Sequence, residues 1–195
     1  MITIDPLYSK LSFEELINII CNDEKIQSTK DGRAAVHENF EFLKKFAEGK
    51  TIEGVNSGFS FPEQKVKQHS TKQQTEEIRY HYSEKGTPLS PKISKATMVL
   101  KLNEILQAKS GVNKSVVRVL EYFINENIIP QIYVRHVPAM LNKRGLSNIA
   151  KALIGEGLVI YENKLYPTAD LMHRFKIQPI DIAGREGFAL TSGTA

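Results

Sequence analysis

The residues best suited to chemistry are a histidine and a glycine-containing segment that precedes it. Gly54, Asn56 and Gly58 fall within residues 53–60, and glycines permit positive φ angles and close approach of another group to the backbone. Taken alone, this pattern predicts no more than a turn between helices. His81 could act as a general acid or base, because an imidazole exchanges its proton near neutral pH.

Metal and disulfide chemistry are not expected. The other histidines show no metal-ligand spacing with one another; they are His37, His69, His136 and His173. Cys21 is the only cysteine, which excludes an internal disulfide and a multi-cysteine metal site, and which suits a cytoplasmic protein. Because Cys21 follows Ile19 and Ile20, we expect it to be a buried small hydrophobe.

Composition is that of an ordinary globular domain. The chain has 195 residues, 41% hydrophobic and 25% charged, which fits one domain or slightly more. It contains no apolar run of about 18 residues and no signal-peptide pattern at its N-terminus, so no membrane association is expected. The net charge is +4, but lysines alternate with glutamates, so no nucleic-acid partner is expected.

The elements that must position these residues are mostly helices. Ser12 and Glu15 predict a capping box at the start of one helix. An apolar face predicts a second helix that stops near Gly49. Pro62 can open a third helix that runs to about residue 83, and Ser90-Pro91 predicts the cap of a fourth helix that runs towards Leu106. The second helix's face consists of Val36, Phe40, Leu43 and Ala47.

The second half of the sequence is expected to form shorter elements. Val116, Leu120, Phe123 and Ile124 form one face of a helix that ends before Pro130. Pro138 and Gly145 interrupt the pattern, and Ser147 is expected to cap a short helix. Residues 159–161 and 164–166 predict a small hairpin around Glu162-Asn163, and Thr168 is expected to cap a helix to Phe175. The fold class is therefore mainly α with a small β-hairpin, and no boundary divides residues 1–195.

Six segments follow one another along the chain in a recognisable order. The first is Glu-Gly-Val-Asn-Ser-Gly-Phe-Ser at residues 53–60, and the others are Tyr80-His81-Tyr82 before Pro88-Leu89, Met98–Asn103, Ser110–Val112, Ala152–Gly157, and Arg185–Leu190 with Gly193-Thr194. In this order they resemble the aromatic amino acid lyases, the family of histidine, phenylalanine and tyrosine ammonia-lyases, which begins with a Tyr-Gly-x-Asn-Thr-Gly-Phe-Gly loop. The resemblance covers nearly the whole chain and implies the helical N-terminal domain of the histidase/aspartase-like fold.

The same resemblance implies an electrophile that this sequence lacks. Family members cyclise and dehydrate an Ala-Ser-Gly triplet to a methylidene-imidazolone. Aligned without a gap between Pro130 and Ala152, the triplet's position holds Met140, Leu141 and Asn142. Leu141 has no hydroxyl to lose and Asn142 carries a Cβ where glycine is needed. We therefore expect no methylidene-imidazolone and no other cofactor.

Other functional positions of the family are also altered. Glu53 stands where the family has its catalytic tyrosine; a buried carboxylate could act as a base, but an exposed turn glutamate is the favoured interpretation. His81 matches the family's acid/base histidine, and without its partners it is expected to be a hydrogen-bonding residue. Ser192 replaces the Asn of the family's Asn-Gly-Thr and has a shorter reach. Gly54, Asn56 and Gly58 are retained in the substrate loop.

The resemblance leaves three interpretations open. Family members continue into long helices that form the oligomer core, so residues 1–195 would lack the C-terminal helical half, and the face with Val116, Leu120 and Phe123 would lose part of its cover. The chain could be an inactive homologue that still binds an aromatic amino acid or assembles with lyase-like chains as a homo- or hetero-oligomer. It could be half of a working ammonia-lyase completed by another chain, or a non-catalytic helical interaction protein.

Overall fold

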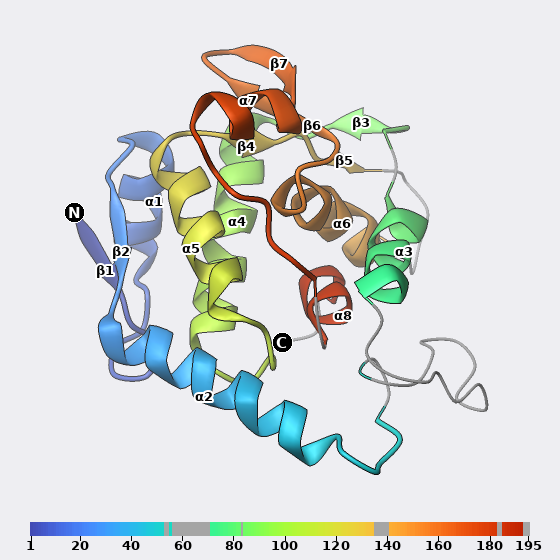
Figure 1. The fold of residues 1–195 in the computed structure, drawn as a ribbon. Coiled ribbons are helices and arrows are strands. Elements are labelled where there is room, and N and C mark those ends of the chain that lie inside the picture. The colour runs from blue at the N-terminus through green and yellow to red at the C-terminus, as the bar shows by residue number, and fades with distance from the viewer. Residues whose placement is uncertain (53–54, 56–70, 83, 135–140, 183–184, 193–195) are drawn as a thin grey trace.

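Helices dominate the computed structural model, which describes residues 1–52, 55, 71–82, 84–134, 141–182 and 185–192 (Figure 1). The helices of this part are α1 Phe13–Cys21, α2 Lys30–Phe46, α3 Thr71–His81, α4 Pro91–Leu106, α5 Lys114–Asn125, α6 Leu141–Leu153, α7 Thr168–Arg174 and α8 Glu186–Thr191. The strands are β1 Ile2–Ile4, β2 Ile26–Ser28, β3 Thr87–Pro88, β4 Ile129–Pro130, β5 Tyr133–Val134, β6 Leu158–Tyr161 and β7 Lys164–Pro167. The predicted mainly α class with a small hairpin is confirmed.

Helix starts follow the capping signals in the sequence. Ser12 accepts from the Glu15 backbone N–H, and Glu15 accepts from the Ser12 N–H at 2.8 Å, which completes the predicted capping box. Ser90 accepts from the Ile93 N–H, with Pro91 in the first turn of α4. The third predicted helix is observed from Thr71 to His81, and residues 62–70 of that prediction lie outside the described part.

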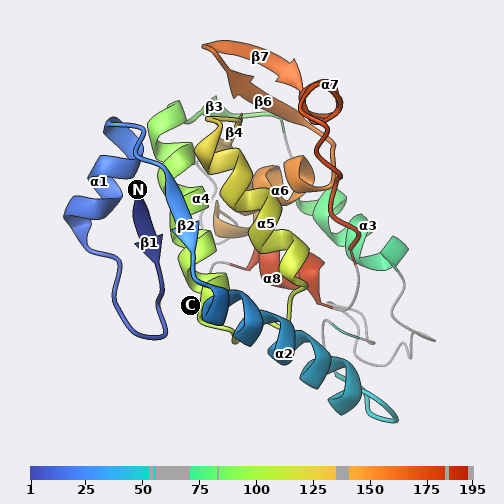
Figure 2. The same cartoon turned by 60° about the vertical axis from the view of Figure 1, so that its left-hand side comes forward.

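The core surrounds α4 and α5, which pack against each other in the middle of the molecule (Figures 1 and 2). Val116, Leu120 and Phe123 are all 0% exposed, so the expectation that this face lacks cover is wrong. Elements of the chain itself cover α5, namely β2, α2 and α6, in addition to α4. Burial of a large side chain of this kind contributes about 1.5–3 kcal/mol each.

Small parallel and antiparallel sheets border the helices. β1 pairs with β2 in parallel, β3 with β5 antiparallel, and β4, β6 and β7 form an antiparallel sheet. Side chains of α5 bind the backbone of β2. The Ile26 N–H donates to Asn125 Oδ1 at 2.8 Å, and Asn125 Nδ2 donates to the Ile26 carbonyl. The Ser28 N–H donates to Glu121 Oε2 at 2.9 Å. The α5 side chains therefore satisfy backbone groups of β2 that no strand pairs.

The β6–β7 hairpin is confirmed with its turn residues. Val159 faces Tyr166 and Ile160 faces Leu165 across the two strands. Glu162 and Asn163 have φ angles of 49° and 60°. Left-handed conformations at both central residues are the geometry of a two-residue hairpin turn whose twist matches the strands.

Four local predictions are wrong. α6 begins at Leu141, so Ser147 is an interior, fully buried residue rather than a cap; Gly145 does not interrupt the helix but lies where an added Cβ would be 3.4 Å from Ile132 Cγ2. Thr168 is the first residue of α7, and its hydroxyl donates to the Gly157 carbonyl instead of capping the helix. Cys21 is exposed, because α1 buries Ile19 and about 100° of helical rotation per residue turns Cys21 away.

A buried lysine of α4 holds the turn after α1 and the turn after α5. The Lys95 ammonium, whose side chain is 5% exposed, donates to Asp23 Oδ1 at 2.7 Å and to Asn127 Oδ1 at 2.6 Å. Asp23 and Asn127 have φ angles of 53° and 52°, so both turns adopt left-handed backbones to present their side chains to Lys95. The hydrogen bond from Lys95 lowers the pKa of the Asp23 carboxyl, and partial burial opposes that shift.

Asp23→Asn is therefore expected to reduce stability in full above about pH 4 and progressively less as the pH falls below it. A carboxyl with a lowered folded pKa contributes stability above its unfolded pKa, near 3.9, and loses that contribution as pH falls through the folded value. Urea unfolding of the wild type and the variant should differ at neutral pH and converge below about pH 4. Asp181→Asn, at an exposed position, is the control, and a difference independent of pH would contradict the assignment.

Candidate functional site

His81 is the last residue of α3, a helix that packs against α6 and α8, which also pack against each other (Figure 1). It is 8% exposed, and its Nε2 lies 2.8 Å from Glu77 Oε1, one helical turn earlier. The Glu77 side chain is 13% exposed, so its carboxylate is largely withdrawn from solvent. A carboxylate that accepts from one ring nitrogen leaves the other nitrogen of a neutral imidazole as an acceptor.

An ion pair attaches the histidine-bearing end of α3 to the end of α6. The Arg79 guanidinium donates to both carboxylate oxygens of Glu156, with an Nε–Oε2 distance of 3.2 Å. These hydrogen bonds raise the pKa of Arg79 and lower the pKa of Glu156. The two side chains are 54% and 33% exposed. The pair therefore fixes the position of α3 relative to the segment after α6 more than it adds to the free energy of unfolding.

Tyr82 forms the second attachment of this end. The Lys151 ammonium lies 3.4 Å from the centroid of the Tyr82 ring, a cation–π contact. Gly157 has a φ angle of 75°, and a Cβ there would lie 3.3 Å from the Tyr82 hydroxyl. Burial, and then the hydrogen bond to Glu84, raise the pKa of the Tyr82 phenol. Arg79 and Tyr82 thus lie against Glu156 and Gly157, which follow α6.

Ser192 lies at the other end of the site, where it caps α8. Its carbonyl accepts from the Lys101 ammonium at 2.8 Å, and the same ammonium donates to the Ala189 carbonyl and to Glu104 Oε2, each at 2.9 Å. The Lys101 side chain is 2% exposed. α4 therefore fixes the backbone at the end of α8, which in turn packs against the helix of His81.

The remaining predicted site residues are only partly placed. Glu53, Gly54, Asn56, Gly58 and Met140 lie outside the described part of the chain. Leu141 and Asn142 are the first two residues of α6, and their side chains lie outside the described part. The described structure thus brings together α3, which carries His81, α8, which ends at Ser192, and α6.

Comparison with known proteins shows to which family the chain belongs. A profile described as aromatic amino acid lyase matches residues 11–195. The chain belongs to this family. Histidine ammonia-lyase from Staphylococcus aureus strain NCTC 8325 / PS 47 is 33% identical over 196 residues, which cover 99% of this chain and 37% of that protein. The chain therefore spans little more than a third of the length of such curated relatives.

Solved structures show the same fold for this family member. Tyrosine aminomutase from Streptomyces globisporus superposes with a TM-score of 0.88 at 24% identity, over 97% of this chain and 36% of that one. Histidine ammonia-lyase from Trypanosoma cruzi gives 0.86 at 23% identity, over 99% and 37%. Ergothionase from Treponema denticola gives 0.91 at 20% identity, over 98% and 39%. At these identities the likeness concerns the fold.

Two further observations concern metal sites and membrane spans in this lyase-family chain. Among the described residues, no group of three or more His, Cys, Asp or Glu side chains could hold a metal ion. No helix of the described part is long and apolar enough to cross a membrane. The site residues that sequence reasoning missed are Glu77, Arg79, Glu156 and Lys101. Of these, Glu77 was open to prediction, because four-residue spacing puts it beside His81 on one helix face.

Proposed function

We propose that this chain is an aromatic amino acid lyase homologue that keeps the family's histidine but does not form the methylidene-imidazolone and releases no ammonia by itself. One observation carries the proposal: residues 131–144 contain no serine, threonine or glycine. The conclusion that the hydroxyl and the glycine are missing therefore does not require that the alignment be correct to the residue. The backbone of Leu141 and Asn142 also belongs to a helix rather than to a free loop. The residues present do not fit the group.

The other altered positions support the same conclusion. Glu53, which stands for the catalytic tyrosine, is best explained as a turn glutamate, and Ser192 has a shorter side chain than the asparagine it replaces. His81 keeps a carboxylate partner in Glu77, so its proton-exchange chemistry is the one function of the site that the described contacts support. A general acid or base without an electrophile does not expel ammonia from an amino acid.

Purified chain given L-histidine, L-phenylalanine or L-tyrosine is expected to release no ammonia above a buffer control. Release that His81→Ala abolishes would overturn the proposal. Restoring Ala-Ser-Gly at positions 140–142 is expected to give no activity, because Glu53 still occupies the tyrosine position and the chain spans 37% of its curated relatives. An intact ammonia-lyase of the family is the positive control for the assay.

Retained ligand binding is a separate part of the proposal. An aromatic amino acid is the ligand class that the relatives' names suggest, since they include histidine ammonia-lyase and tyrosine aminomutase. Isothermal titration with each of the three amino acids should show binding that His81→Ala weakens. Absence of heat with all three would leave a non-catalytic helical interaction protein as the better interpretation. We place this function in the cytoplasm.

Completion by another chain is the second candidate, favoured by the fraction of its relatives that the chain spans. A lyase-like partner would supply an intact Ala-Ser-Gly and the remaining helices. Co-expression of the chain with such a protein should then yield a complex whose ammonia release exceeds that of the partner alone. A partner whose activity is unchanged by the chain would remove this candidate.

A further inference from the structure

A small hollow lies between α5 and the segment that follows α7. Its volume is about 180 Å³. The residues that line it, here called the α5–α7 hollow, are Arg118, Val119 and Tyr122 of α5 together with Phe175, Lys176, Ile177 and Gln178. Two of these residues are cationic and two are aromatic, whereas none of them is acidic. The α5–α7 hollow therefore combines positive charge with apolar surface.

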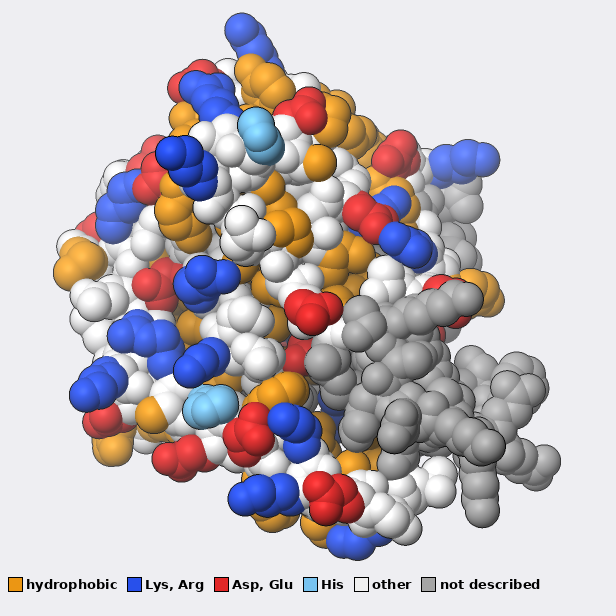
Figure 3. Space-filling model, viewed as in Figure 1, with side chains coloured by type: hydrophobic (Ala, Val, Ile, Leu, Met, Phe, Trp, Pro, Cys, Tyr) orange, Lys and Arg blue, Asp and Glu red, His pale blue; other side chains and the backbone are white. Residues whose placement is uncertain are grey.

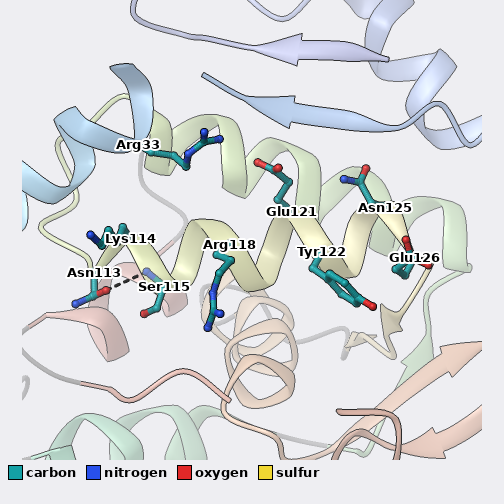
Figure 4. Close-up of a pocket in the computed structure, with 9 residues that line it drawn as sticks. All are labelled: Arg33, Asn113, Lys114, Ser115, Arg118, Glu121, Tyr122, Asn125 and Glu126. Carbon is teal, nitrogen blue, oxygen red and sulfur yellow. Dashed lines mark hydrogen bonds between the residues drawn. The ribbon is translucent and has the colours of Figure 1, made fainter. Parts of the chain in front are cut away.

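Arg118 and Lys176 carry the positive charge of the α5–α7 hollow. Both side chains are exposed, and among the described residues neither makes an ion pair or a side-chain hydrogen bond. Figure 4 shows Arg118 pointing to the same side of α5 as Tyr122, whereas Glu121 and Asn125 point to the β2 side. Both cations are therefore available to an anion from outside the chain.

Aromatic and aliphatic side chains form the apolar part of the α5–α7 hollow. Tyr122 is 37% exposed, and its ring packs edge-on against Phe175 with the centroids 6.5 Å apart. Val119 is 1% exposed and belongs to the core, and Ile177 packs against the core from the other side. An apolar cavity of about 150 Å³ is enough to hold benzene. The α5–α7 hollow, at about 180 Å³, therefore has room for one aromatic ring.

A larger hollow of about 640 Å³ adjoins this one and shares two α5 side chains with it (Figure 4). Its lining has charges of both signs, because Arg33 and Lys114 are accompanied by Glu121 and Glu126. On the face drawn in Figure 3, basic and acidic side chains are likewise interspersed, which does not favour a polyanion such as a nucleic acid. Positive charge without acidic neighbours is thus found in the α5–α7 hollow, which has the size of a single small anion.

We propose that the α5–α7 hollow binds a small aromatic carboxylate, with the ring of the ligand against Tyr122 and its carboxylate on the Arg118 guanidinium. The planar fork of a guanidinium matches the two oxygens of a carboxylate, and aromatic rings pack on one another edge-on or offset. Lys176 adds a second positive charge, which disfavours a free amino acid because its ammonium adjoins its carboxylate. The site uses neither His81 nor Ser192 and is independent of the proposed function.

The ring and the charge of the ligand must act together at this site. An ion pair at an exposed arginine contributes little by itself, because water and salt screen it. A ring without a charge gains only the burial of its apolar surface and still loses its freedom of motion on binding. An aromatic carboxylate makes both contacts and loses that freedom only once. Binding is therefore expected to require both groups in one molecule.

Titration with benzoate tests the proposal, followed by the amide NMR shifts of the isotope-labelled chain. Saturable shifts are expected at residues 118–122 and 175–178, which line the α5–α7 hollow. Benzamide keeps the ring without the charge, and acetate keeps the charge without the ring. Each of these two compounds should bind at least about tenfold more weakly than benzoate, because each lacks one of the two contacts.

Arg118→Met should raise the dissociation constant for benzoate about tenfold or more, since a charge-assisted hydrogen bond is lost. Arg118→Lys keeps the charge but not the fork, and its value should fall between the two. Lys114→Met is the matched control, because it removes an exposed cation of α5 that does not line the α5–α7 hollow. It should change the constant less than about twofold, and His81→Ala should leave it unchanged.

The same spectra show whether each variant is folded. Four results would each overturn the proposal: no saturable shift with benzoate, equal affinity for benzamide, equal weakening by Lys114→Met and Arg118→Met, or shifts confined to residues 71–82 and 186–192. The last result would place the ligand beside His81 instead and would leave the proposed function standing.

Discussion

Replacing Gly187 with alanine is expected to lower the free energy of unfolding by about 2 kcal/mol. Gly187 lies in α8 where a Cβ would be 2.6 Å from the backbone oxygen of Gln74 and 2.7 Å from its Oε1. Because the first of these atoms belongs to the backbone of α3, the two helices must move apart. Overpacking of this kind costs about 3 kcal/mol, and the better helix propensity of alanine returns at most about 1 kcal/mol.

Gly145→Ala provides the matched control for this variant. It also replaces a glycine within a helix, but its Cβ would lie 3.4 Å from Ile132 Cγ2, which is an ordinary van der Waals contact. Its free energy of unfolding should change little or rise by up to about 1 kcal/mol. Urea unfolding of both variants measures the difference. Equal stability of the two variants would show that α3 and α8 are not in the close contact described.

Lys101→Met is expected to cost about 3 kcal/mol. Methionine has a similar length and preserves the packing, but it leaves the carbonyls of Ala189 and Ser192 without the ammonium that now donates to both. Removal of one member of a buried charged group typically costs about 3–5 kcal/mol, and here the partial exposure of Glu104 places the effect at the lower end. The variant should also loosen the end of α8, which amide hydrogen exchange at residues 189–192 would report.

Glu104→Gln separates the two roles of Lys101. It removes the carboxylate but keeps both carbonyl contacts, and the Glu104 side chain is 27% exposed. Its free energy of unfolding should fall by less than about 1 kcal/mol. If this variant were as unstable as Lys101→Met, the stabilisation would come from the ion pair and not from the carbonyls of α8.

Local signals predicted most of the fold. Ser12 with Glu15 and Ser90 with Pro91 start helices as expected, because a cap needs only neighbouring residues. Ser147 and Thr168 were misread for the same reason: their hydroxyl groups are equally suited to a cap and to other contacts, and only tertiary packing decides. Cys21 was misplaced because two preceding isoleucines do not define which face of α1 is buried.

The candidate site was less predictable than the fold. The resemblance supplied His81 and Ser192 as site residues, but not the role of Lys101, whose ammonium donates to the Ser192 carbonyl 91 positions further along the chain. The Arg79–Glu156 pair spans 77 positions and carries no local pattern. Such long-range contacts depend on how α3, α4, α6 and α8 meet, and a single sequence does not specify that geometry.

The side chains of α5 that bind β2 have a consequence for how the protein behaves in a crowded solution. A strand with unpaired N–H and carbonyl groups at its edge is a template on which another chain can add a strand, and such addition leads to aggregation. Asn125 gives the Ile26 backbone both an acceptor and a donor, and Glu121 accepts from the Ser28 N–H. Two side chains of a helix thus close this edge of β2 to foreign strands as a third strand would, and they do so without a flat surface that could itself be extended.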